Sequence, residues 1–425
     1  MFTKQASRNG DLSVFLFWSP FATNPRASES IFDKNSVRLR RQYMKYLTLS
    51  FVILLTLSTV HRAQTPQVAS SIHDFIKINS QILNEERTIL VRVPANYRDP
   101  STRFPAIYML DAHAPQNAMM VGLVEQQAWG GVTPEMIVVG IQNTERTRDL
   151  TPTKEGRATV GGGLDRFLEF IEKEVIPLVE KNYRTQPYRV FAGHSYGGLA
   201  VVYSMLTRPR IFDAYIAASP TLHYDNDLVI KRAEEAFKQN KEWDKTLFAS
   251  IGDEPEYVKG FNAFQTLLKK SDLKKLKYDF QVYKDENHGS TVLRSYYAGL
   301  RKVFDSWAPP AEISVTSLEN HYESLSKRFG YKIAVPEALQ NRAAYSLLRA
   351  NQIDEAIRYF KKNVENYPNS ANTYDSLAEA YEKSGQVKQA LENYEKAYKM
   401  AELRGESQLA VSSKASFARL AAKIK

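Results

Sequence analysis

One serine of this chain has the sequence surroundings of a catalytic nucleophile. It lies in the run Phe191-Ala192-Gly193-His194-Ser195-Tyr196-Gly197-Gly198-Leu199, which contains the pattern Gly-x-Ser-x-Gly. The β-branched and aromatic residues 188–192 predict a buried strand before it, and the apolar run 199–206 predicts a helix after it. A serine at such a sharp strand-to-helix turn is exposed to solvent, and the start of the helix directs N–H groups and its positive dipole end toward an oxyanion. Ser195 is therefore the candidate nucleophile.

A serine nucleophile needs a base, and the chain has 7 histidines from which to choose one. After a serine elbow of this kind, the acid and then the histidine follow along the chain. His288 lies in the run 280–290, where an alternating, strand-like segment passes into a polar turn, and loops at strand ends often carry catalytic groups. His321 lies in a charged helical stretch that predicts a solvated side chain, whereas His223 and Tyr224 follow the serine closely and are expected to line the pocket. We expect His288 to be the base.

The acid should lie in the loop that follows the strand between the serine and the histidine. Residues 247–251 predict that strand, and Gly252-Asp253-Glu254-Pro255-Glu256 forms the loop that leaves it. Spacing alone does not rank the three carboxylates. Glu256 lies far enough beyond the glycine to turn back toward the histidine, so we take Glu256 first and Glu254 second. The acid would hold the imidazole tautomer and stabilise the imidazolium ion.

Several motifs occur in order along the chain: Arg87–Pro94 with Tyr97, Ile107–Asp111, Val138–Ile141, Arg146–Pro152 and the serine and histidine segments. Together they resemble the esterase family that includes enterochelin esterase, esterase D and the mycolyltransferase antigens. The resemblance implies an α/β-hydrolase fold without a large lid, and an ester substrate. It also implies an oxyanion hole made by the N–H of Tyr196 and an N–H near Asp111 and Ala112. Tryptophans that siderophore esterases of the family often carry are missing from 219–224, which weakens that substrate without excluding it.

The N-terminal segment predicts export. Residues 47–60 form an apolar run of about 14 residues after several Lys and Arg residues, which is short of the ~20 residues of a spanning helix and typical of a secretory signal. Met44 is a natural start for such a signal, so we interpret 44–63 as a signal peptide and 1–43 as a leader without a fold of its own. The alternative is an uncleaved membrane anchor. Either interpretation predicts a periplasmic or extracellular hydrolase.

A second module follows the predicted hydrolase domain at 70–308. Ala356 and Phe360 recur 34 residues later as Ala390 and Tyr394, which is the period of tetratricopeptide helix hairpins. Two hairpins are few for an independent array, so flanking helices at 314–329 and 406–423 should complete an all-α region spanning 314–425. This region could bind a protein partner, mediate self-association or only support the hydrolase.

Composition excludes several other functions. The net charge of +10 does not predict nucleic-acid binding, because residues 1–43 hold seven Lys/Arg and three Asp/Glu and so supply about four of these charges. The chain has 0 cysteines, which removes a thiol nucleophile and a disulfide framework. His113 has only Asp111 beside it as a potential metal ligand, and Gly161-Gly162-Gly163 lacks the Lys-Ser/Thr of a phosphate loop. We therefore expect neither a metal nor a cofactor.

The sequence predicts a secreted serine hydrolase that cleaves a small-molecule or glycan-linked carboxylic ester through an acyl-enzyme. One alternative is a siderophore esterase acting on an enterobactin-type trilactone, or an acyltransferase. Another is a non-catalytic adaptor in which the helical repeats carry the function and the hydrolase domain is degenerate. Contact with a membrane is expected only through an uncleaved signal segment. The intact order of serine, acids and histidine favours the esterase.

Overall fold

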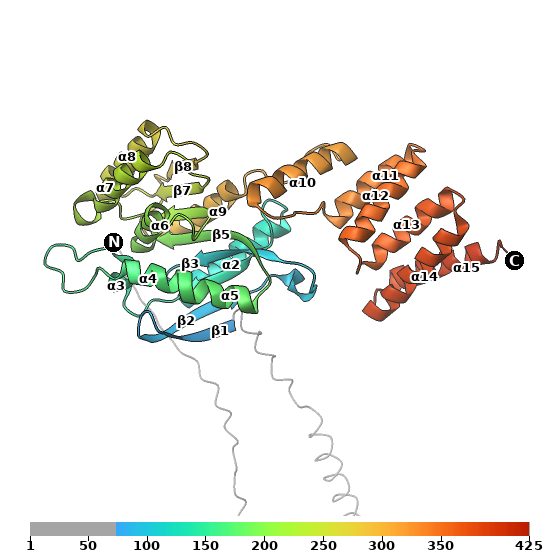
Figure 1. Ribbon diagram of the computed structural model, residues 1–425, viewed down its shortest axis with the longest axis horizontal. Helices are drawn as coiled ribbons and strands as arrows, with labels where there is room; N and C mark the ends of the chain where they lie inside the picture. The colour runs from blue at the N-terminus through green and yellow to red at the C-terminus, as the bar shows by residue number, and fades with distance from the viewer. Residues whose placement is uncertain (1–73, 425) are drawn as a thin grey trace, which may run out of the picture. The chain divides into compact units, whose positions relative to one another are not determined.

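The computed structural model describes residues 74–424, which contain an eight-stranded sheet followed by helices (Figure 1). The strand order is β1-β2-β4-β3-β5-β6-β7-β8. Strands β1, β2 and β4 pair antiparallel, and all the remaining pairs are parallel. This α/β sheet with a following helical region confirms the expected fold class. The strands are β1 (Asp74–Ser80), β2 (Glu85–Arg92), β3 (Phe104–Met109), β4 (Ile137–Ile141), β5 (Thr185–His194), β6 (Ala214–Ala218), β7 (Thr246–Ile251) and β8 (Lys277–Val282).

The central strands are apolar runs because helices cover both faces of the sheet. Every residue of β3, β4, β6 and β7 is buried. Successive side chains point to opposite faces, so Tyr108 joins one hydrophobic core while Ile107 and Met109 join the other. Helices α4 to α8 pack on the first face, and α2 and α9 on the second. These helices are α2 (Ala114–Trp129), α3 (Arg146–Leu150), α4 (Leu164–Phe170), α5 (Ile176–Asn182), α6 (Tyr196–Thr207), α7 (Tyr224–Gln239), α8 (Pro255–Lys270) and α9 (Thr291–Val303), with short helical segments η1 (Ala95–Arg98) and η2 (Ile171–Val175).

Helix α10 (Val315–Phe329) packs on the hydrolase domain as well as on the repeats. The Phe329 ring meets Tyr188 edge-on at 4.9 Å and lies 5.3 Å from the Phe304 ring. Nearer the start of the helix, Glu319 accepts a hydrogen bond of 2.6 Å from Lys362 of the repeats. The helix that the sequence assigned to the repeat region therefore also closes part of the hydrolase core.

The remaining helices form the two expected hairpins and a final helix. They are α11 (Glu337–Arg349), α12 (Ile353–Asn366), α13 (Ala371–Lys383), α14 (Val387–Arg404) and α15 (Ser407–Ala421) (Figure 1). Ala356 and Ala390 are both fully buried, and the aromatic residues Phe360 and Tyr394 four positions later are buried as well. A small residue at these positions allows the paired helices to approach each other closely, which explains the 34-residue recurrence.

None of the helices within residues 74–424 is both long enough and apolar enough to cross a bilayer. The predicted leader 1–43 and signal segment 44–63 lie outside the described residues.

Candidate active site

Ser195 occupies the turn between β5 and α6. Its backbone has φ 60° and ψ −119°, a conformation that a non-glycine residue rarely adopts and that is typical of a nucleophile elbow. The Ser195 N–H donates to the Ala218 carbonyl oxygen at 3.0 Å, which fixes the turn to the neighbouring strand β6. A Cβ atom at Gly193 would lie 2.4 Å from the carbonyl group of Gly197, so the tight turn requires glycine there. The local sequence therefore produces the strained serine that the motif predicted, with its side chain partly exposed.

Glu254 is the carboxylate that contacts His288. Its Oε2 lies 2.5 Å from His288 Nδ1. Its Oε1 accepts hydrogen bonds from the Ser219 hydroxyl at 2.6 Å and from the Gly252 N–H at 2.7 Å. The histidine lies in the loop after β8, and the glutamate lies in the loop after β7. The carboxyl ends of adjacent parallel strands thus bring the two side chains together.

The expected acid, Glu256, does not occupy this position. Helix α8 begins at Pro255, so Glu256 lies in the first helical turn, where its side chain is exposed. Glu254 precedes the proline, outside the helix, with φ −133° and ψ 79°, and is 5% exposed. Asp253 is also exposed. The helix start therefore decides which carboxylate turns inward.

The environment of Glu254 favours its ionised form. Burial raises the pKa of this carboxyl, but hydrogen bonds from Ser219, His288 and the Gly252 amide lower it by more, so the pKa lies below its usual value. A carboxylate held in this way can stabilise a positive charge on His288.

A second histidine contacts His288 from the other side. His194 Nε2 lies 2.7 Å from the His288 carbonyl oxygen, and the two rings lie 4.6 Å apart. Burial lowers the pKa of His194 to about 4, helped by the neighbouring imidazole, so the ring is neutral near pH 7 and its Nε2–H donates to that carbonyl. The Tyr257 ring also lies 4.6 Å from the His288 ring. Residue 194 is a variable position of the Gly-x-Ser-x-Gly motif, and no local pattern in the sequence indicates this contact.

Ser195 and His288 line the same cavity, whose volume is about 590 Å³. Apolar walls come from Leu110, Met119 and Val292. Within residues 74–424 no direct hydrogen bond joins the serine hydroxyl to the imidazole, and such bonds often shorten only when substrate binds.

The two residues expected to line the pocket lie outside this cavity. The His223 ring packs edge-on against Tyr257 at 5.1 Å, so one aromatic ring separates it from His288. Tyr224 is buried, and its hydroxyl donates to the Thr153 carbonyl oxygen at 2.9 Å. Both residues follow Ser195 closely along the chain, but the segment that carries them turns away from the cavity and packs against α8. The expectation that they line the pocket is therefore wrong.

Two of the three expected oxyanion positions have an available amide. Tyr196 is the first residue of α6, where a backbone N–H has no partner within the helix. The Ala112 N–H donates to the Ile141 carbonyl oxygen at 3.2 Å and is therefore engaged. The Asp111 N–H makes no hydrogen bond within residues 74–424, and its residue has φ 55°. The amides of Tyr196 and Asp111 remain the candidate donors.

Two family models match segments of the chain, one in the hydrolase region and one in the helical repeats. Residues 80–254 match the model of the family described as "Putative esterase", and residues 335–402 match the tetratricopeptide-repeat model. Residues 80–254 therefore resemble an esterase domain of that family. The esterase match contains Ser195 and ends at Glu254, so it does not include His288. The pairing of His288 with Glu254 is seen only in the tertiary structure.

Curated relatives of this esterase domain carry siderophore names. The ferri-bacillibactin esterase BesA of Bacillus subtilis is 32% identical over 36% of this chain and 60% of its own length. The siderophore triacetylfusarinine C esterase of Aspergillus fumigatus is also 32% identical, over 37% of this chain and 58% of its own length. The chain thus spans about three fifths of the curated relatives that it matches.

A solved structure shows the same similarity. An IroE-like serine hydrolase from Shewanella oneidensis aligns with a TM-score of 0.61 and 28% identity, covering 69% of this chain and 99% of its own. This likeness agrees with the serine elbow and the α/β core described above.

Proposed function

We propose that the protein is a serine esterase that hydrolyses carboxylic esters through an acyl-enzyme. His288 accepts the proton of Ser195 as the hydroxyl attacks the ester carbonyl, and it returns that proton to the leaving alcohol. Water then releases the acid by the same steps. The observation that carries this proposal is the Glu254–His288 pair of 2.5 Å beside the cavity that Ser195 lines.

Charge develops on the carbonyl oxygen in each tetrahedral intermediate. The amides of Tyr196 and Asp111 are the donors proposed to bind it, and one such donor typically contributes about 10²- to 10³-fold in rate. Glu254 accepts the Nδ1–H of His288, which leaves Nε2 unprotonated and able to act as the base.

The test is covalent labelling and turnover of purified residues 64–425. We expect a fluorophosphonate to label Ser195 and short activated esters to be hydrolysed, and we expect Ser195→Ala to abolish both, because triad serines contribute on the order of 10⁶-fold. Ser412→Ala, at an exposed position of α15, is the matched control and should leave both unchanged. Unchanged turnover in the Ser195 variant would exclude the serine mechanism and favour the non-catalytic adaptor.

A siderophore substrate is the second candidate, favoured by the names of the two curated relatives. It is tested by comparing kcat/KM for a trilactone siderophore with that for a simple aryl ester of similar size. A preference of less than about tenfold would favour a general esterase, because a tenfold ratio corresponds to only ~1.4 kcal/mol of transition-state discrimination.

We also propose that the protein acts outside the cytoplasm, on the evidence of the predicted signal at 44–63. The tetratricopeptide helices would bind a protein partner or a second copy of the chain. Fractionation of cells that express the full chain tests the location, and recovery of the protein in the cytosolic fraction would contradict it.

A further inference from the structure

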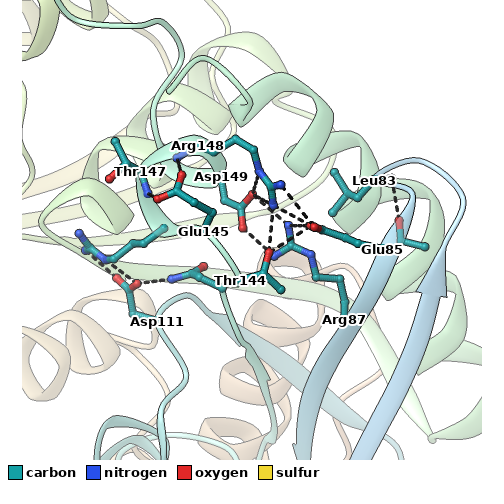
Figure 2. Close-up of polar contacts among 12 residues, drawn as sticks. Leu83, Glu85, Arg87, Asp111, Thr144, Glu145, Thr147, Arg148 and Asp149 are labelled. Carbon is teal, nitrogen blue, oxygen red and sulfur yellow. Dashed lines mark hydrogen bonds and ion pairs between the residues drawn. The ribbon is translucent and has the colours of Figure 1, made fainter. Parts of the chain in front are cut away.

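Asp111 combines a strained backbone with a fully engaged carboxylate. Its φ of 55° lies in the left-handed region that non-glycine residues avoid. Its Oδ1 accepts from Arg146 Nε at 2.7 Å and from Asn143 Nδ2 at 2.5 Å, and its Oδ2 accepts from Arg146 Nη2 at 2.9 Å. Figure 2 shows Asp111 at the end of this chain of polar contacts. A bidentate pair of this kind fixes orientation as well as distance.

The same guanidinium also holds the nucleophile elbow. Arg146 Nη2 donates to the His194 carbonyl oxygen at 3.2 Å, one residue before Ser195. A Cβ atom at Gly197 would lie 3.1 Å from Asp111 Oδ2, so the carboxylate lies close to the first turn of α6. One side chain therefore bridges the two segments that carry the candidate oxyanion amides.

Helix α3 in turn holds Arg146 in place. Three residues along, the buried Asp149 makes two hydrogen bonds with the buried Arg87 of β2, at 2.6 and 2.9 Å. Arg148 donates to Glu85 at 2.7 Å (Figure 2). The helix is thereby anchored to the antiparallel side of the sheet while its first residue reaches the active site.

We propose that Arg146 and Asp111 form a positioning clamp that sets the second donor of the oxyanion hole. The inference rests on the proposed esterase function. Without the ion pair, Asp111 is free to relax toward an extended φ, which rotates its N–H away from the developing oxyanion. Arg146 acts through Asp111 and is a positioning residue for the reaction.

The test compares Asp111→Asn, Arg146→Gln and the double variant in the enzyme that carries the repeats. Each single variant should lower kcat by about 10- to 100-fold while KM changes less than about threefold, because the lost interaction acts in the transition state. The double variant should lose no more than the worse single one, since both break the same pair. Affinity for an arylboronic acid, whose tetrahedral adduct resembles the intermediate, should fall in parallel with kcat/KM.

Replacing Arg146 by lysine, and a control variant elsewhere in the domain, distinguish a positioning role of Arg146 from a general loss of structure. Arg146→Lys cannot make the bidentate contact and should recover little activity, whereas added guanidinium should partly rescue Arg146→Ala. Arg189→Gln breaks a partly exposed ion pair between the middle of β5 and Glu180, away from the cavity, and should leave kcat unchanged.

Three outcomes would overturn the clamp. The first is a raised KM with unchanged kcat, which would make Arg146 a substrate contact. The second is full additivity in the double variant, and the third is unchanged kinetics in both single variants. Failure of the proposed function would look different, because the wild-type protein itself would then lack both Ser195 labelling and ester turnover.

Discussion

Replacing Glu254 by glutamine tests the catalytic role of the buried carboxylate. The glutamine oxygen can still accept the hydrogen bonds that Ser219 and the Gly252 amide give to Glu254 Oε1. Its NH₂ group would then face His288 Nδ1 in place of Oε2. That contact favours the tautomer with a proton on Nε2, which is the nitrogen that must act as the base.

The expected loss follows from this change of tautomer. Substituting the triad acid by its amide typically lowers kcat by about 10³- to 10⁴-fold, which corresponds to roughly 4–5.5 kcal/mol of transition-state stabilisation. Glu256→Gln is the matched control, because Glu256 is two residues away and exposed. It should change kcat by less than about twofold.

The assay is steady-state hydrolysis of a short aryl ester at pH 7.5, with circular dichroism and thermal unfolding to show that both variants fold. Glu254→Gln should retain slow fluorophosphonate labelling, because Ser195 and the oxyanion amides remain in place. The reasoning fails if Glu254→Gln keeps at least a third of wild-type kcat, or if Glu256→Gln loses more activity than Glu254→Gln.

Two further predictions concern stability. Because burial lowers the pKa of His194 to about 4, the unfolded chain binds more protons between about pH 6.5 and pH 4, and the wild type loses stability as the pH falls through that range. His194→Gln should lose about 1–2 kcal/mol less between pH 7.5 and pH 5 in urea titrations, and an equal loss would contradict the buried neutral histidine. A chain ending after Trp307 should unfold at a lower temperature than one ending after Gly330, because it uncovers the aromatic cluster that Phe329 closes, at a cost of about 2–4 kcal/mol. Both chains should still label at Ser195, and equal melting temperatures would assign α10 to the repeats alone.

Local sequence was sufficient where backbone sterics or a fixed period decide the outcome. Gly193 and Gly197 permit a turn that few other residues tolerate, so the Gly-x-Ser-x-Gly pattern between an apolar strand and an apolar helix predicted the elbow at Ser195. The recurrence of Ala356 as Ala390 predicted two helix hairpins for a similar reason, since only small residues suit these buried helix contacts.

Tertiary packing decided the features on which the chemistry depends. Glu254 and Glu256 are equivalent in type and nearly so in spacing. The start of α8 at Pro255 leaves Glu254 facing inward, and packing against the loop that holds His288, 34 residues later, brings the two side chains together. From the sequence, the Ala112 N–H was a candidate oxyanion donor, but in the fold it donates to the Ile141 carbonyl oxygen of β4. The contact between Arg146 and Asp111 joins residues 35 positions apart. A sequence pattern carries local propensity, whereas burial and hydrogen-bond partners depend on segments that only the folded chain brings together.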